Sequence, residues 1–222
     1  MFKRYANIVL LSALALLSGA ASASVTYDLT DSNNCFPIGC GPMHYEQIYS
    51  ASQFTTGAVA ISSIGFRPDA MYGHAFGPTA VDLDIGLAAT TVDPSAISAD
   101  FAQNQAASLV QVFSGTAMIS SDGSGSYDIL FPFTSNFLYD PAKGNLLLDL
   151  NVKNSQNVSP LAAGYSPLVG RATVNYGFAE GGYGLATRFE TAAADVPEPA
   201  TLSLFAFGLA GCIAVRRKVA KK

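Results

Sequence analysis

Apolar and polar residues alternate one by one in short runs along most of this 222-residue chain. In the run from Val81 to Leu87, four apolar residues alternate with Asp82, Asp84 and Gly86. A period of two residues places the apolar side chains on one face of a β-strand. The same period returns at residues 127–133, 145–152, 174–178 and 185–189. Clusters of Gly, Pro, Asn, Asp and Ser separate about ten such strands, which predicts an all-β fold, an antiparallel β-sandwich of jelly-roll type.

Two places interrupt this alternation. The apolar phase changes between Ile61 and Ile64, which predicts a β-bulge at Ser62-Ser63. Pro132 lies inside an alternating run. Because proline has no N–H to donate to a sheet ladder, Pro132 predicts a sheet edge or another bulge.

One segment has a different character. Asp93 and Pro94 have the order of a helix N-cap and a first-turn proline, and Ser95–Gln105 is rich in Ala and Gln. We therefore expect one short helix over Ser95–Gln105.

The N-terminal residues have the three parts of a secretory signal peptide. Lys3 and Arg4 precede an apolar stretch from Ile8 to Leu17, and Ala21 and Ala23 form a small-residue cleavage site. This order predicts export through the Sec translocon and removal of residues 1–23 by signal peptidase. An uncleaved N-terminal anchor is the alternative interpretation.

The C-terminal residues also have three parts: the bend Val196-Pro197-Glu198-Pro199, an uncharged apolar run, and a basic end at Arg216, Arg217 and Lys218. The prolines prevent an upstream helix from continuing through the bend. The apolar run, Thr201–Val215, is 15 residues long, which is shorter than the roughly 20 residues that span a bilayer comfortably. Arg216 and Arg217 extend its reach by snorkelling, and the basic end is expected to stay cytoplasmic.

This tail resembles the PEP-CTERM sorting signal of Gram-negative surface proteins. The resemblance implies a division into a signal peptide (1–23), an ectodomain (24–195) and a sorting tail (196–222). It also implies that a membrane-embedded exosortase cuts near Pro197–Pro199, so that the precursor is held only transiently in the inner membrane. The product is then expected at the cell surface or in an extracellular polysaccharide matrix, as in a biofilm. An ordinary C-terminal anchor is the alternative.

Several phrases of the central region resemble a recurrent, uncharacterised β-rich ectodomain of PEP-CTERM proteins. They are Tyr45-Glu46-Gln47-Ile48-Tyr49, Ile64-Gly65-Phe66-Arg67, Leu138-Tyr139-Asp140-Pro141 and the run Gly144–Asp149. The resemblance covers most of residues 43–190. It implies an extracytoplasmic β-rich fold and brings no known catalytic residues with it.

Charge is distributed very unevenly between the centre and the ends. Residues 24–200 hold all 16 acidic residues but only five of the 12 Lys and Arg, a net charge of −11 for this part against −4 for the whole chain. An acidic exported domain repels nucleic acid and anionic lipid, so nucleic-acid binding is excluded as a function class. Adhesion to polysaccharide then requires neutral sugars or divalent cations.

Two of the three cysteines are close together in sequence. Cys35 and Cys40 flank a turn-like insert, which predicts a disulfide in an oxidising compartment. A metal site that joins both cysteines to His44 is the weaker alternative, because a fourth ligand is not evident. Cys212 lies in the tail and is expected to pack as a small apolar residue.

Catalytic signals are few. The chain has two histidines, His44 and His74, and no G-x-S-x-G elbow. His74 lies in a Gly-rich loop, where a solvated role is expected. A glycosidase needs two acids across a cleft, and the sequence does not place Glu46 and Glu180 relative to one another. We therefore predict a protein that is not an enzyme, with a secreted carbohydrate-active enzyme as the alternative.

Two acidic clusters are candidates for calcium. Asp82 and Asp84 share one strand face, and Asp122 and Asp128 flank a Gly-Ser loop. The loop lacks the ligand order of an EF-hand. A solvated sheet surface and a tight polar hairpin are the alternative interpretations. If calcium binds, it would indicate a calcium-dependent adhesin.

Aromatic side chains are candidates for sugar stacking, although Trp is absent. Five of them lie in or beside Gly-rich loops: Tyr72, Phe76, Tyr165, Tyr176 and Tyr183. Such residues either form an exposed platform for sugar rings or complete the core. The sequence thus predicts a non-catalytic structural or exopolysaccharide-binding module.

Overall fold

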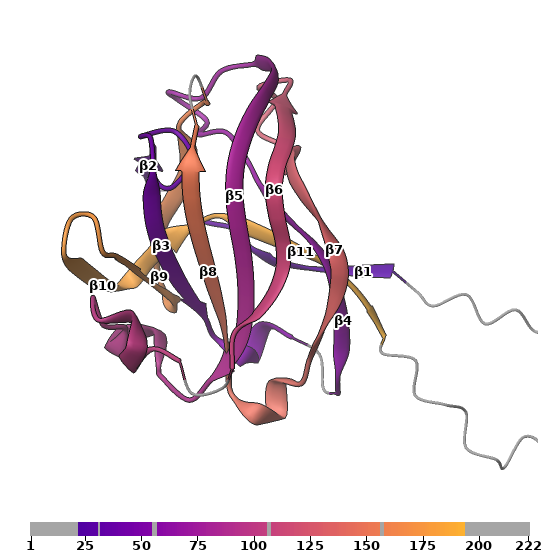
Figure 1. Cartoon of the computed structure of the whole chain (residues 1–222), viewed down its shortest axis with the longest axis vertical. Helices are drawn as coiled ribbons and strands as arrows, with labels where there is room; N and C mark the ends of the chain where they lie inside the picture. The colour runs from indigo at the N-terminus through magenta and orange to yellow at the C-terminus, as the bar shows by residue number, and fades with distance from the viewer. Residues whose placement is uncertain (1–21, 31, 55–56, 106–107, 156–157, 194–222) are drawn as a thin grey trace, which may run out of the picture.

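The protein is described from a computed structural model, which places residues 22–30, 32–54, 57–105, 108–155 and 158–193. Across these residues the chain forms eleven β-strands and four 3-10 turns, and no α-helix. The strands build two antiparallel sheets that face each other (Figure 1). The prediction of an all-β antiparallel sandwich is confirmed, while its finer jelly-roll topology stays a prediction.

The smaller sheet has four strands. Its order is β1 (Ser22–Tyr27), β11 (Thr187–Ala193), β4 (Val59–Phe66) and β7 (Ile129–Tyr139). Ser22 pairs with Ala192, so the first and last described strands are neighbours. The predicted cleavage point after Ala23 falls inside β1. The ends of β1 and β11 lie on the side of the molecule away from β10 (Figure 1).

The larger sheet is wider by several strands. Its order is β10 (Phe178–Leu185), β9 (Leu161–Thr173), β3 (Met43–Tyr49), β8 (Asn145–Asn154), β5 (Phe76–Thr90) and β6 (Val110–Ser121), and β2 (Ser32–Asn34) pairs with β9. We call the face of this sheet that turns toward the smaller sheet its inner face, and the opposite face its outer face. Because the smaller sheet has fewer strands, it does not cover the inner face at the β10 edge.

Both predicted irregularities are present. The register of β4 shifts between Ile61 and Ser63 against both of its neighbours, which is the bulge expected at Ser62-Ser63. Pro132 lies on β7, the last strand in the order of the smaller sheet, and pairs with Ser63 at that bulge. Its missing N–H therefore falls where the ladder is already interrupted.

The predicted helix over Ser95–Gln105 is wrong. Two separate 3-10 turns stand there, η2 (Pro94–Ala96) and η3 (Phe101–Gln103), in addition to η1 (Ala51–Gln53) and η4 (Pro141–Lys143) elsewhere. Asp93 and Pro94 do begin a turn as expected. However, Ser98 accepts a hydrogen bond from the amide of Asp100, and Asp100 accepts one from Ala102 and caps a second turn. These short polar side chains compete for the N–H groups that a continuous helix would use.

The core fills the space between the sheets. Alternate residues of β3, β4, β5 and β8 are fully buried there, together with large aromatic side chains, among them Tyr45, Tyr49, Phe66, Phe131, Tyr139 and Phe189. A second, smaller cluster lies on the outer face. Ile97 and Phe101, from the segment that carries η2 and η3, pack there with Ile48, Ala88, Leu147 and Ala172. We call residues 93–104 the cover segment.

The cover segment approaches the sheet closely enough to require a glycine. A side chain at Gly170 would overlap the backbone carbonyl oxygen of Pro94. Gly170 therefore allows η2 to lie directly on β9, and this contact holds the cover segment in place over the outer face.

None of the helical turns in the placed residues is long and apolar enough to cross a membrane. The predicted signal peptide up to Ala21 and the predicted tail from Val196 to Lys218 lie outside the described residues.

Candidate functional site

A hollow of about 410 Å³ opens on the outer face, over β3, β8 and β5. We call it the outer hollow. Its polar lining side chains are His44, Asp84, Gln105, Gln111, Asp149 and Asn151. Leu109 forms an apolar wall and packs against Gly86, where an added side chain would collide with it. The volume is within the range of small-ligand sites.

His44 and Asp149 form an ion pair inside the hollow. His44 Nε2 lies 2.8 Å from Asp149 Oδ2, and the side chains are 39% and 9% exposed. The hydrogen bond to Asp149 raises the pKa of His44, because it stabilises the protonated ring. The ring also meets the edge of Phe101 at a centroid distance of 4.7 Å, so the cover segment holds the ring in place.

Glu46 lies next to this pair and is fully buried. It is the cross-strand partner of Asp149. Asn104 Nδ2 donates a hydrogen bond to Glu46 Oε2 at 2.6 Å, while Oε1 has no partner among the described residues. Burial raises the pKa of Glu46 to about 7, and the charge of Asp149 acts in the same direction.

Asp84 stands on the opposite wall of the hollow. Ser114 Oγ donates to its Oδ1 at 2.7 Å and Lys153 Nζ at 2.9 Å. These two donors lower the pKa of Asp84, the hydroxyl having the larger effect. Lys153 is itself 44% exposed at the rim.

The acidic pair considered for glycosidase chemistry is not assembled. Glu46 faces the outer side of the large sheet beside His44 and Asp149. Glu180 accepts two hydrogen bonds from Arg171, whose cross-strand partner on β3 is Gln47. Gln47 and Glu46 are consecutive in β3 and point to opposite faces. The two glutamates therefore cannot act across one cleft.

A second surface lies on the inner face, at the edge formed by β9 and β10. We call it the aromatic row; it consists of Tyr165, Tyr183, Arg171, Phe178, Phe36 and Tyr176. The rings of Tyr165 and Tyr183 are 4.8 Å apart, and those of Phe36 and Tyr176 are 5.0 Å apart and stacked. The Arg171 guanidinium lies 4.0 Å from the ring centre of Tyr183 and 5.2 Å from that of Phe178. Phe178 in turn is 6.3 Å from Phe36, which closes the series.

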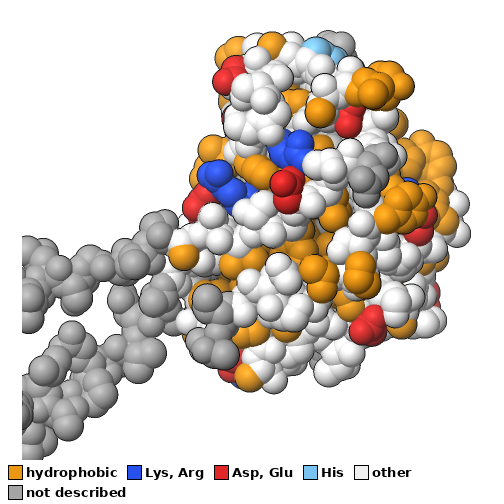
Figure 2. All heavy atoms as spheres, turned by 180° about the vertical axis from the view of Figure 1, so that it is seen from behind, with side chains coloured by type: hydrophobic (Ala, Val, Ile, Leu, Met, Phe, Trp, Pro, Cys, Tyr) orange, Lys and Arg blue, Asp and Glu red, His pale blue; other side chains and the backbone are white. Residues whose placement is uncertain are grey.

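The ends of the aromatic row are open to solvent. Tyr165 is 67% exposed and Tyr176 is 60% exposed, whereas Tyr183 is buried. Figure 2 shows hydrophobic side chains gathered on the side of the molecule that carries β10. The inner face is core where the smaller sheet covers it, and becomes surface where that sheet ends.

Three of the five predicted aromatic residues therefore come together, namely Tyr165, Tyr176 and Tyr183. Tyr72 lies in the loop before β5 and Phe76 is the first residue of β5, so neither belongs to the row. Sequence reasoning missed Arg171 and Phe178, which share an inner-face ladder with Tyr183. The strand predicted from the alternation at 174–178 is wrong for its first four residues, because residues 174–177 form the turn between β9 and β10 and only Phe178 lies in a strand. The alternation also does not show that this ladder is uncovered.

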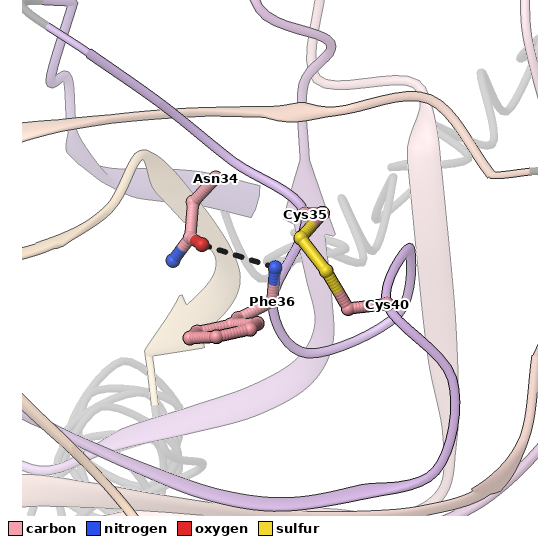
Figure 3. The surroundings of a disulfide bond; sticks show 4 residues. All are labelled: Asn34, Cys35, Phe36 and Cys40. Atoms are coloured by element: carbon pink, nitrogen blue, oxygen red, sulfur yellow. Dashed lines mark hydrogen bonds between the residues drawn. A yellow bond between two sulfur atoms is a disulfide. The ribbon is translucent and has the colours of Figure 1, made fainter. Parts of the chain in front are cut away.

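Cys35 and Cys40 are joined by a disulfide, with a Cα–Cα distance of 5.2 Å (Figure 3). Both sulfurs are thereby used, and His44 is paired with Asp149, so the proposed Cys-Cys-His metal site is not formed. Within the same loop, Asn34 accepts a hydrogen bond from the amide of Phe36 at 3.1 Å. The disulfide loop thus presents Phe36 to the aromatic row.

The calcium candidates use their carboxylates in local contacts. Asp128 accepts from the amide of Asp122 and Asp122 from that of Ser124, as in a tight polar hairpin. Asp84 is occupied by Lys153 and Ser114, and Asp82 lies two residues from it on the same strand. In the part of the chain that the structure describes, no three His, Cys, Asp or Glu side chains are grouped to hold a metal ion.

Comparison with known proteins identifies the tail. Residues 195–218 match the PEP-CTERM protein-sorting motif. No curated protein and no solved structure matches the chain. The resemblance of residues 43–190 to a PEP-CTERM ectodomain therefore stays a prediction. The chain is a β-rich protein with a PEP-CTERM protein-sorting motif at its C-terminus, and hence an exported exosortase substrate.

Proposed function

We propose that the exported domain is a non-catalytic module that binds polysaccharide at the cell surface or in the extracellular matrix through the aromatic row. The observation that carries this proposal is a continuous series of rings, with an arginine between two of them, whose ends are largely exposed. The hydrophobic C–H face of a sugar ring packs on an exposed aromatic ring, which buries apolar area without a charged contact.

Charge supports a neutral partner. Residues 24–200 carry a net charge of −11, so an anionic polysaccharide is repelled unless cations screen it. Within the row, Arg171 is paired with Glu180, so this site adds little net charge. Stacking on neutral sugars is therefore the contact that this surface favours.

The position of the row fits a tethered protein. The described ends, Ser22 and Ala193, belong to neighbouring strands of the smaller sheet, and β10 lies on the opposite side of the molecule (Figure 1). A precursor held through its C-terminal tail would therefore present the row away from its point of attachment. Binding could begin before exosortase releases the protein.

The binding test compares the two exposed rings of the row with a similarly exposed ring outside it. Tyr165→Ala combined with Tyr176→Ala removes both exposed rings of the row, and we expect retention on neutral matrix polysaccharide to fall roughly tenfold or more. The control is Tyr72→Ala, because Tyr72 is 61% exposed but lies outside the row. Equal loss in both variants, or none in the double variant, would contradict the proposal.

The route to the surface is tested separately. We infer Sec export, removal of the signal peptide after Ala23, and a transient inner-membrane stage before exosortase cuts the tail. Alanine at Pro197, Glu198 and Pro199 should trap the precursor in the inner membrane. Mass spectrometry of the natural product should find a C-terminus upstream of Arg216; a product intact through Lys222 would count against processing.

A further inference from the structure

We propose that the pairing of β1 with β11 closes the signal-peptidase site, so that the signal peptide must be removed before the smaller sheet forms. This inference rests on the proposed function, since it takes the cut after Ala23 as a step on the route to the surface. It adds an order of events to that route, in which removal of the signal peptide precedes the folding of the last strand. The aromatic row plays no part in it.

The bond to be cut lies within a paired strand. Ala23 and Ser24, the residues on either side of this bond, are opposite Thr191 and Glu190 on β11. Thr191 Oγ1 also donates a hydrogen bond to the carbonyl oxygen of Ala23 at 3.2 Å, and Thr191 is only 3% exposed. That oxygen belongs to the peptide bond that is cut. In the folded chain it is therefore already bound to β11.

A peptidase needs the same atoms free. Hydrolysis adds water across the bond, which leaves a carboxylate on Ala23 and an ammonium group on Ser24. The enzyme must hold the flanking backbone in an extended form and stabilise the negative charge that develops on the carbonyl oxygen. Cleavage of the folded chain therefore requires β1 to separate locally from β11, and its rate follows the small fraction of molecules that are open.

β1 is anchored to the core at its far end. Tyr27 is 3% exposed, and its ring lies 4.8 Å from that of Tyr49 and 6.4 Å from that of Phe189. The hydroxyl group of Tyr27 donates a hydrogen bond to the backbone carbonyl of Ser50. A peptidase that grips several residues beyond the cut must lift the strand as far as this anchor. The buried ring thus opposes the opening that cleavage requires.

Export leaves the bond free for a long interval before the sheet closes. Thr191 is 168 positions after Ala23. Because the N-terminus is exported first, Ala23 stays uncovered until β11, the last described strand, has crossed the membrane. Antiparallel pairing then places Ser22 beside Ala192, so that the two predicted membrane segments continue from neighbouring residues. A chain that has kept its signal peptide can therefore still fold, and its cleavage site becomes protected.

The uncut sheet is also the more completely paired one. The cut removes Ser22 and Ala23 from β1, so Ala192 and Thr191 lose their partners on that strand. The hydroxyl group of Thr191 loses its acceptor as well. Once these contacts have formed, cleavage must work against them, which makes the folded precursor a trap for chains that are cut too late.

Order of addition tests the inference on the full-length precursor in detergent, with its disulfide formed. One sample is diluted from urea directly into buffer that contains signal peptidase, and a second sample is refolded before the peptidase is added. We expect ready cleavage in the first sample and a rate about tenfold lower or less in the second. Mass spectrometry should identify Ser24 as the new first residue.

Variants assign the protection to β1. Tyr27→Leu weakens the anchor without touching the cleavage site, so the refolded variant should be cut several-fold faster than refolded wild type. The control is Phe131→Leu, which changes a fully buried ring on β7, at the opposite edge of the same sheet. If Tyr27→Leu fails to refold, Thr191→Val serves instead. It removes only the hydroxyl group that holds the Ala23 carbonyl and should raise the rate about twofold or more.

Equal cleavage of the two wild-type samples would overturn the inference and leave the proposed route intact. Equal acceleration by Tyr27→Leu and Phe131→Leu would also overturn it, because the protection would then come from the whole fold and not from β1. If neither wild-type sample is cut after Ala23, the inference and the predicted cleavage point fail together. Binding of polysaccharide by the aromatic row is tested separately and does not depend on any of these results.

Discussion

The two faces of the large sheet are covered by different kinds of structure. The inner face is covered by a second sheet, and where that sheet ends the row of rings around Arg171 remains at the surface. The outer face is covered by two short turns, which bury Ile48 and Leu147 but leave a hollow beside them. The inner surface is aromatic with one arginine, while the outer one is acidic with one histidine.

The difference shows that the exposure of a side chain on the large sheet depends on what covers its face, and not on the strand that carries it. β3 places Tyr45 and Gln47 on one face and His44 and Glu46 on the other, as its alternation requires. Gln47 is satisfied by the backbone of Leu185 and by Tyr45. Glu46 meets a loop amide and is left with an unpartnered oxygen. The unpartnered atom on the outer face belongs to a titratable acid, so we expect the outer face to respond more strongly to pH.

The largest effect is expected where the cover segment touches the sheet. Gly170→Val should lower the free energy of unfolding by about 3 kcal/mol or more, because the new side chain overlaps the Pro94 carbonyl and displaces η2. Urea denaturation measures this loss. Gly77→Val is the matched control, since an added side chain at Gly77 meets nothing within 4 Å. Equal stability of the two variants would mean that the cover segment does not depend on this contact.

The next largest effect is expected from replacing the buried acid Glu46. Glu46 has a pKa of about 7 in the fold against 4.5 ordinarily. The folded state therefore keeps a proton that the unfolded chain releases between these pH values, and stability falls as pH rises through this window. Glu46→Gln removes the penalty and should raise the free energy of unfolding by roughly 2 to 3 kcal/mol at pH 8, with little change near pH 4.

The difference between wild-type and Glu46→Gln urea curves, taken from pH 4 to pH 8, measures this effect together with the smaller change that losing the Glu46 charge makes to the pKa of His44. A pH-independent difference would show that Glu46 ionises normally in the folded protein.

The disulfide should act on the inner surface alone. Cys35→Ser combined with Cys40→Ser opens a short loop and should lower the free energy of unfolding by about 2 kcal/mol. Because that loop presents Phe36 to Tyr176, retention on neutral polysaccharide should also weaken. The NMR signals of His44 should keep their positions. A shift of His44 on removal of the disulfide would mean that the two surfaces are coupled.

The smallest effect concerns the cation within the row. Arg171→Lys keeps the charge beside Glu180 but loses the planar contact with Tyr183, so stability should fall by about 1 kcal/mol. Arg188→Lys is the control and should have a smaller effect, because Arg188 lies 5.9 Å from the ring centre of Tyr127. Thermal unfolding distinguishes the two; equal losses would indicate that the ring contact of Arg171 adds nothing.

Much of the fold could be predicted from local sequence patterns. Most of the alternating runs, the bulge at Ser62-Ser63 and the interrupted ladder at Pro132 could be predicted, because each depends on residues close in sequence. The runs at 174–178 and 185–189 were not single strands, since the first is a turn up to Gly177 and the second crosses the break between β10 and β11. The helix over Ser95–Gln105 could not, since Ser98 and Asp100 redirect the backbone locally while Ile97 and Phe101 find partners on a distant sheet. Among the aromatic candidates, Tyr165 and Tyr183 are cross-strand partners on β9 and β10. The sequence between them does not show which residues of the two strands are paired, so their contact could not be predicted.

The sequence by itself determined the strand pattern and the sorting tail, because hydrophobic period, proline bends and charge order are properties of consecutive residues. Tertiary structure alone decided that His44 meets Asp149 across 105 positions, that Glu46 is buried against Asn104, and that Arg171 lies between Tyr183 and Phe178. The physical reason is that each of these contacts depends on strand register and on where a covering layer ends, and both are set by the packing of the whole domain.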